Sequence, residues 1–240
     1  MAGRQGERAV SNRASGEVRD GGQRAWPAVT EEAGGTAERV IGPACAKLVA
    51  ELRDGRPEDF ASGPLPPGQA GPPVTLATEQ VSALYLTAFA AVAGASPPPT
   101  GAPPGPVVWS DGEHELLVQP AAVRILFQEG FVLVGIPVYT EQTGPAEISV
   151  PFAVGSASQP AGLMIATETV PRGPALLVER WGDQLIAAAW RALVHMVSGV
   201  AAAAGSDTGG GLLIAAALAA EPDGLTVLPQ AAQAFDRPVS

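Results

Sequence analysis

The chain has 240 residues and a formal net charge of −10, with 46% hydrophobic residues, 29 glycines and 24 prolines. This acidity weighs against a nucleic-acid partner, because binding to phosphates requires clustered cations. A single cysteine, Cys45, cannot form an internal disulfide, and no charged-then-apolar secretion signal opens the chain, so we expect a cytoplasmic protein.

The first 35 residues contain few large apolar side chains and many glycines, arginines and acidic residues. Such a segment cannot bury enough surface to offset the entropy of ordering, so residues 1–35 are predicted to be a disordered arm. The apolar spacing that follows predicts a helix from Thr36 to Leu52, ended by Asp54-Gly55. Gly42-Pro43 interrupts this pattern, and a later start at Pro43 is the alternative.

Two segments rich in proline and glycine, 63–73 and 96–106, are predicted to be extended, poorly paired connectors. Between them, residues Thr78 to Val92 place their apolar side chains on one helical face, which indicates a docking helix. We therefore expect residues 36–105 to form two short helices joined by flexible linkers.

Residues 106–232 are predicted to form an α+β globular domain. Alternating apolar residues and turn signals predict strands over 107–109, 114–118, 123–128, 131–139, 147–154, 163–170 and 175–180. Their short connections favour an antiparallel meander of about six to seven strands covered by amphipathic helices. The strand 131–139 is apolar on both faces, so it should be central and covered on both, with Pro137 marking failed pairing on one side. Pro151 suits an edge strand.

Asp183 is well placed to cap a helix that runs to about Ala204 across the sheet. Residues 212–220 and 225–228 flank Glu221-Pro222-Asp223-Gly224 and predict a terminal hairpin, with an alanine-rich helix over 212–220 as the alternative. Residues 233–240 are predicted to be a flexible tail.

The predicted helix from Asp183 to about Ala204 is long enough to cross a membrane. However, Arg191 alone costs about 2.5 to 3.5 kcal/mol at the bilayer centre, so insertion of this helix is not expected.

The sequence holds no nucleophile elbow, phosphate loop or paired metal-ligand motif, so no cofactor and no metal are predicted, and the balance is against an enzyme. His114, between two glutamates, is expected to lie in a solvated turn. The polar junction 179–184 is the leading site candidate, because tryptophan and arginine are enriched at binding hot spots. The interaction candidates are Arg180, Trp181, Asp183, Arg191 and His195. Alternatively the junction is structural, with Asp183 as a helix cap and Trp181 packed over the sheet.

These observations favour a non-enzymatic interaction or assembly component, an adaptor or a homo-oligomer, that binds a protein partner or itself through its sheet domain and tethered helices. The alternative is a small-molecule-binding protein or a hydrolase with a pocket between the sheet and the helix 183–204. That alternative requires the convergence of Arg124, Glu168, Arg172, Glu179, Arg191 and His195. A weaker third hypothesis is peripheral membrane association through the C-terminal alanine-rich region.

Overall fold

The computed structural model describes residues 31–56, 65, 68–96, 102–162, 169–205 and 212–232. The predicted α+β class and antiparallel pairing are confirmed. The predicted arm up to residue 30, the tail 233–240 and most of the predicted strand 163–170 lie outside the described residues. The helical elements are α1 (Glu31–Gly55), α2 (Thr78–Ala93), the 3-10 turn η2 (Pro120–Ala122) and α3 (Ala175–Gly205). The strands are β1 (Val74–Ala77), β2 (Val107–Ser110), β3 (Glu115–Val118), β4 (Arg124–Gln128), β5 (Gly130–Thr140), β6 (Gly144–Gly155), β7 (Ala161–Gly162), β8 (Leu213–Glu221) and β9 (Gly224–Ala231).

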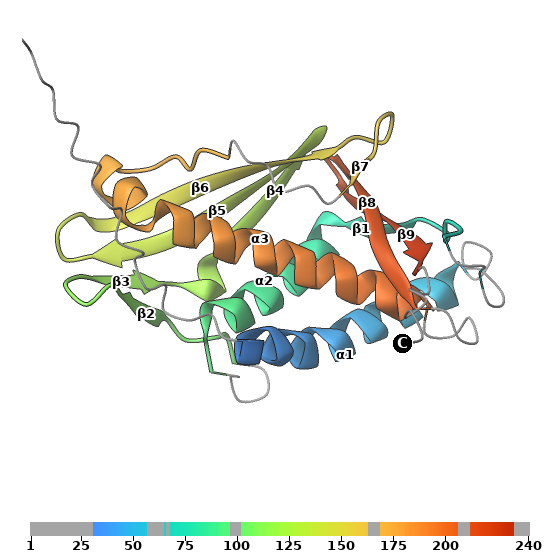
Figure 1. Ribbon diagram of the computed structural model, residues 1–240, viewed down its shortest axis with the longest axis horizontal. Helices are drawn as coiled ribbons and strands as arrows, with labels where there is room; N and C mark the ends of the chain where they lie inside the picture. The colour runs from blue at the N-terminus through green and yellow to red at the C-terminus, as the bar shows by residue number, and fades with distance from the viewer. Residues whose placement is uncertain are drawn as a thin grey trace, which may run out of the picture.

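The strands are divided between two antiparallel sheets. The larger, five-stranded sheet has β5 at its centre, with β6 on one side and both β4 and β3 on the other, and β2 extends it beyond β3. The smaller, four-stranded sheet has the order β1-β9-β8-β7. Figure 1 shows α3 running along the molecule from the larger sheet to the smaller one. One hydrophobic core, built from all three long helices and both sheets, joins these parts.

The first helix begins earlier than predicted. α1 starts at Glu31, before the predicted start at Thr36, and continues through Pro43, so the alternative start at Pro43 is wrong. A proline inside a helix removes one backbone hydrogen bond. Here Ile41, Cys45 and Val49 are fully buried beside α3, and this packing offsets the lost bond.

A short strand precedes the docking helix. The helix is confirmed as α2, with the buried face that its spacing predicts. The end of the connector 63–73 is not poorly paired, however, because Gly68 and Gly71 donate to carbonyls of β9 and Ala70 forms a bridge to Gln230. β1 follows this connector and pairs with β9 along its whole length. β1 was missed because it follows Pro72-Pro73 and has only four residues, too few for a clear alternating pattern.

The central position of β5 is confirmed, and so is the gap in its pairing. β4 pairs with β5 as far as Gly135, and β3 resumes the pairing only at Val138. Pro137 lies in this gap, where its missing N–H costs no ladder hydrogen bond. β6 is an edge strand, as Pro151 indicated, and apart from its pairing with β5 it makes two isolated bridges, from Ser149 to Arg172 and from Gly155 to Pro160.

The predicted strand 175–180 is wrong, because these residues form the first turns of α3. Leu177, Trp181 and Leu185 are buried at a spacing of one helical turn, so the buried stripe of the helix extends backwards past Gly182. The rest of that stripe is confirmed, with Leu193, Met196 and Val200 fully buried. The terminal hairpin is confirmed as β8 and β9, and the helical alternative for 212–220 is wrong.

Candidate interaction surface

The five side chains predicted to form a site do not gather in one place. Trp181 is only 1% exposed, so its expected role as a surface anchor is corrected: it packs in the core. Asp183 is exposed in the interior of α3 and caps no helix end, because the helix starts at Ala175. Arg191 is exposed and lies about 16 Å from Arg180 along the helix axis. His195 follows one turn later and is half-buried.

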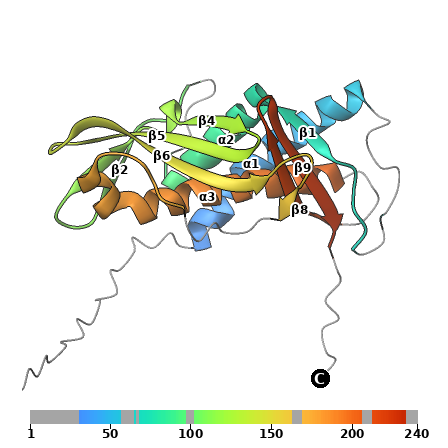
Figure 2. The ribbon, with the colours of Figure 1, turned by 90° about the horizontal axis from the view of Figure 1, so that it is seen from above.

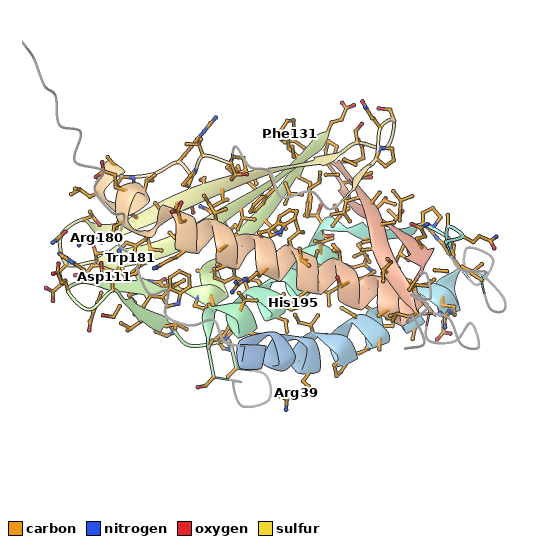
Figure 3. All side chains as sticks on the ribbon, in the orientation of Figure 1. Arg39, Asp111, Phe131, Arg180, Trp181 and His195 are labelled. Carbon is orange, nitrogen blue, oxygen red and sulfur yellow. The ribbon has the colours of Figure 1, made fainter. Side chains whose placement is uncertain are left out.

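Arg180 takes part in a small polar cluster at the end of the first hairpin. Its Nε lies 3.8 Å from Oδ2 of Asp111. Figure 3 shows both residues at the end of α3 nearest this hairpin. The backbone N–H groups of Glu113 and His114 donate to Oδ1 of the same carboxylate, at 3.0 and 2.8 Å. These donors, and more weakly Arg180, lower the pKa of Asp111. The cluster therefore closes the β2–β3 turn and links it to α3.

His114 is more enclosed than the solvated turn predicted for it. Its side chain is 28% exposed, and Nδ1 lies 3.8 Å from Oδ1 of Asp111, too far for a hydrogen bond. No Ser, Thr or Cys side chain is recorded within hydrogen-bonding distance of the ring in the described part of the chain, so the pair has no nucleophile to activate. Among those residues no group of three His, Cys, Asp or Glu side chains could hold a metal ion either.

The most prominent surface feature is one face of the larger sheet. Its inner face is buried against the helices and β8, with Val132, Val134 and Ile136 fully inaccessible. Figure 2, seen from above, shows no described helix drawn across the opposite side of β4, β5 and β6. The prediction that β5 is covered on both faces is therefore wrong.

We call this uncovered side the outer face. Four large apolar side chains dominate it: Val108 (54% exposed), Leu126 (56%), Phe131 (51%) and Tyr139 (41%). In the antiparallel register, Leu126 on β4 lies beside Leu133 on β5, which lies beside Pro151 on β6, while Phe131 lies beside Ala153. Leu117 connects Val108 to Tyr139 across β3, so the apolar residues form two groups, one over β4, β5 and β6 and the other over β2, β3 and the end of β5. Figure 3 shows Phe131 on this sheet, well away from His195 on α3.

One ion pair crosses the middle of the outer face. Arg124 on β4 and Glu147 on β6 are hydrogen-bonded over the central strand, although neither belongs to β5. Gly135 lies beneath them, and a Cβ atom at this position would come within 3.1 Å of the Glu147 carboxylate. A glycine is therefore needed for the pair to lie flat on the sheet. Both side chains remain partly exposed, Arg124 by 67% and Glu147 by 37%.

The border of the outer face is polar. Ser110 and Glu115 form an exposed pair at the β2–β3 end, while Gln128 and Glu129 lie at the β4–β5 turn. An apolar centre with a polar border is the usual anatomy of a protein–protein interface. The sequence signal was present, because β4 and β5 carry large apolar residues at outward positions, but periodicity does not reveal whether another element covers them.

The pocket required by the small-molecule alternative receives no support from these residues. Side chains fill the space between the larger sheet and α3, where the rings of Phe152 and Trp190 lie 5.4 Å apart. A shallow hollow of about 390 Å³ lies elsewhere, between the β4–β5 turn and residues 155–161. Arg124 lies on the outer face, away from Arg191 and His195 on α3, and Glu168 falls outside the described residues.

α3 is long and apolar enough to cross a membrane by length and composition, and half of its most apolar window is buried inside the protein. A core helix meets the same criteria, and α3 packs against α1, α2, β8 and β9.

Comparison with known proteins adds no identity to this description: no family model, curated protein or solved structure matches the chain significantly.

Proposed function

We propose that the protein is a non-enzymatic interaction or assembly component that binds another protein chain on the outer face of its larger sheet. The observation that carries this proposal is the exposure of Val108, Leu126, Phe131 and Tyr139 on one uncovered face of the sheet. Monomeric proteins rarely expose apolar patches larger than a few hundred Å², and such patches with polar borders mark sites of association.

The chemistry of this surface also favours a protein over other ligands. The outer face is wide and lacks a cavity along its centre, so it suits a broad partner rather than a small molecule. Its two central charges cancel, and the chain as a whole is acidic, which disfavours anionic lipid and nucleic acid. Phe131 and Tyr139, near the two ends of β5, are of residue types enriched in interface cores.

Site-specific photo-crosslinking tests this proposal. A photo-reactive amino acid replaces Leu126 or Phe131 in the full chain, in the cells that naturally produce it, and the adducts are identified by mass spectrometry. We expect discrete protein adducts from both positions. The matched control is Ile214, an apolar residue of β8 that is 46% exposed on the smaller sheet, and we expect no discrete adduct from it.

A second substitution ties any adduct to the surface. Leu133→Asp places a charge at the centre of the outer face, so it should remove the adducts formed from Leu126 while leaving the near-ultraviolet circular dichroism spectrum unchanged. An absence of protein adducts from both positions would refute the proposed function, as would equal labelling from Ile214.

A further inference from the structure

The charge pattern of the outer face identifies a specific occupant. We infer that the outer face binds a second copy of this chain, with the two larger sheets packed face to face around a two-fold axis that runs along β5. This inference rests on the proposed function and specifies its partner.

The central ion pair is self-complementary under that symmetry. Arg124 and Glu147 lie on opposite sides of β5, on β4 and β6. A two-fold axis that runs along β5, in the plane between the sheets, brings Arg124 of each copy over Glu147 of the other, so the four charges alternate in sign. An in-plane axis across the strands would instead bring like charges together, and like-charge contacts are unfavourable.

The apolar residues fit the same axis. Phe131, Leu133 and Tyr139 all lie on β5, so each meets its own counterpart along the axis. Leu126, on the β4 side, then faces the β6 side of the other copy, where Pro151 and Ala153 are. Two twisted sheets packed in this way align within about 30° at a separation of about 10 Å, as in a β-sandwich. Gly135 at the centre leaves room for the charges of both copies.

The dimensions of the outer face suit a stable dimer. β5 has 11 residues and is therefore about 37 Å long. Three or four strands at a spacing of about 4.8 Å give a width of about 14 to 19 Å. The projected area is about 500 to 700 Å² per copy, close to the roughly 800 Å² per partner of a standard interface.

Pairing of two copies through the β6 edge of the larger sheet is disfavoured. The N–H of Ser149 on β6 donates to the carbonyl of Arg172 and so points away from β5. Residues two and four positions along the strand point the same way, so Pro145 and Pro151 remove donors from this edge. The bridge from Ser149 to Arg172 occupies part of the remaining free edge of β6.

Charge reversal tests the inference with the full-length chain. Light scattering coupled to size-exclusion chromatography should give a dimer mass for the unmodified protein over a range of concentrations. Arg124→Glu and Glu147→Arg each place four like charges at the axis, so each variant should dimerise about tenfold or more weakly. In an equimolar mixture of the two variants, each copy keeps its own like-charged pair but faces opposite charges on the other copy, so native mass spectrometry should show a heterodimer containing one copy of each.

Two further variants separate an interface effect from misfolding. Leu126→Asp should also give a monomer, whereas Ile214→Asp, on the smaller sheet, should stay dimeric. Circular dichroism spectra matching the unmodified protein verify that each variant is folded. The inference is overturned if the unmodified protein is a monomer at all concentrations, or if the charge variants dimerise as tightly as the unmodified protein or fail to form the heterodimer. If it is a monomer and crosslinking at Leu126 captures a different protein, the proposed function stands and only the second-copy inference fails.

Discussion

The two tyrosines of this chain occupy opposite environments. Tyr85 on α2 is fully buried, and its hydroxyl donates a 3.0 Å hydrogen bond to the carbonyl of Ala189 on α3. Tyr139 on β5 is 41% exposed on the outer face. The phenol of Tyr85 thus joins two core helices through a polar contact, and burial raises its pKa well above the ordinary value.

Replacing each tyrosine by phenylalanine measures this contact. Tyr85→Phe removes the hydrogen bond to Ala189 and should lower the free energy of unfolding by about 0.5 to 1.5 kcal/mol in urea titrations. Tyr139→Phe is the matched control and should change it by less than about 0.5 kcal/mol. Equal effects of the two substitutions would show that the buried hydrogen bond adds no net stability.

Cys45 makes folding stability sensitive to alkaline pH. Its buried Sγ lies 3.8 Å from the carbonyl of Met196, and burial raises the pKa of the thiol from 9.0 to about 11. The unfolded chain therefore loses this proton at lower pH than the folded chain does, so stability is retained below pH 9 and falls between pH 9 and about 11.

Denaturant titrations of the unmodified protein and of Cys45→Ala over this pH range check the prediction. The variant loses some packing at every pH, but its free energy of unfolding should fall less steeply between pH 9 and about 11. Parallel pH profiles would mean that the thiol does not contribute to the alkaline loss of stability.

Individual side chains could be assigned to the core more reliably than to a site. The apolar stripe from Leu185 to Val200 was predicted correctly because helical periodicity reports burial directly. Trp181 was misassigned as a surface anchor because the helix was predicted to begin only at Asp183, after Gly182. The apolar stripe of the helix in fact continues backwards through Leu177. Residue type alone does not distinguish a tryptophan that binds a partner from one that fills a core.

At the scale of elements, α1 and α3 approach closely at one glycine. A Cβ atom added at Gly199 on α3 would lie 2.9 Å from Sγ of Cys45 and 3.4 Å from Cγ2 of Ile41, both on α1. At Gly42 on α1, a Cβ atom would meet no atom of another element within 4 Å, although Pro43 follows it directly in the chain. The same substitution therefore meets a tertiary contact at Gly199 and only a local effect at Gly42.

We expect Gly199→Ala to destabilise the protein by up to about 2 kcal/mol, because overpacking costs about 1 to 3 kcal/mol and alanine regains about 1 kcal/mol of helix propensity. Gly42→Ala meets no tertiary contact, but Pro43 disfavours the helical conformation of a preceding residue that has a Cβ atom, so this cost and the propensity gain should nearly cancel, with a change of less than about 0.5 kcal/mol. Thermal unfolding of both variants tests this contrast. Adding Cys45→Ala to Gly199→Ala should relieve the clash, so a double-mutant cycle that shows no coupling would contradict the close approach.

The elements themselves were predicted with mixed success, for physical reasons. Long periodic segments such as α2 and β6 were identified because each carries its own pattern. β1 was missed because its existence depends on β9, some 150 residues later, rather than on local sequence. The outer face was apolar in the sequence, but only the fold determines whether a neighbour covers it.

At the scale of the whole molecule, the N-terminal elements are part of the core. Ile41 of α1, Leu76 of β1 and Phe89 of α2 belong to the same hydrophobic cluster as the larger sheet. Trp109 on β2 reinforces this connection, because its Nε1–H donates to the carbonyl of Ala93 at the end of α2.

A chain that begins at residue 106 tests the extent of this core. It lacks α1, β1 and α2, leaves the edge of β9 unpaired and exposes the apolar surfaces they cover. We expect it to lose cooperative unfolding and near-ultraviolet circular dichroism, because a gap of this size cannot close around the remaining elements. A chain that begins at Glu31 keeps every described element and should unfold cooperatively. Cooperative unfolding of the shorter chain would show that residues 106–232 fold independently.

The pairing of β1 with β9 also sets the order in which the protein can be completed on a ribosome. Thr75 and Thr226 form a cross-strand hydrogen bond at a separation of 151 residues. At translation rates of about 5 to 20 residues per second, β1 waits about 8 to 30 s for its partner to be synthesised. For most of that interval α1 and α2 also lack α3, the helix that buries their apolar faces. The apolar faces of both helices therefore stay exposed on the nascent chain until α3 emerges, shortly before the last hairpin.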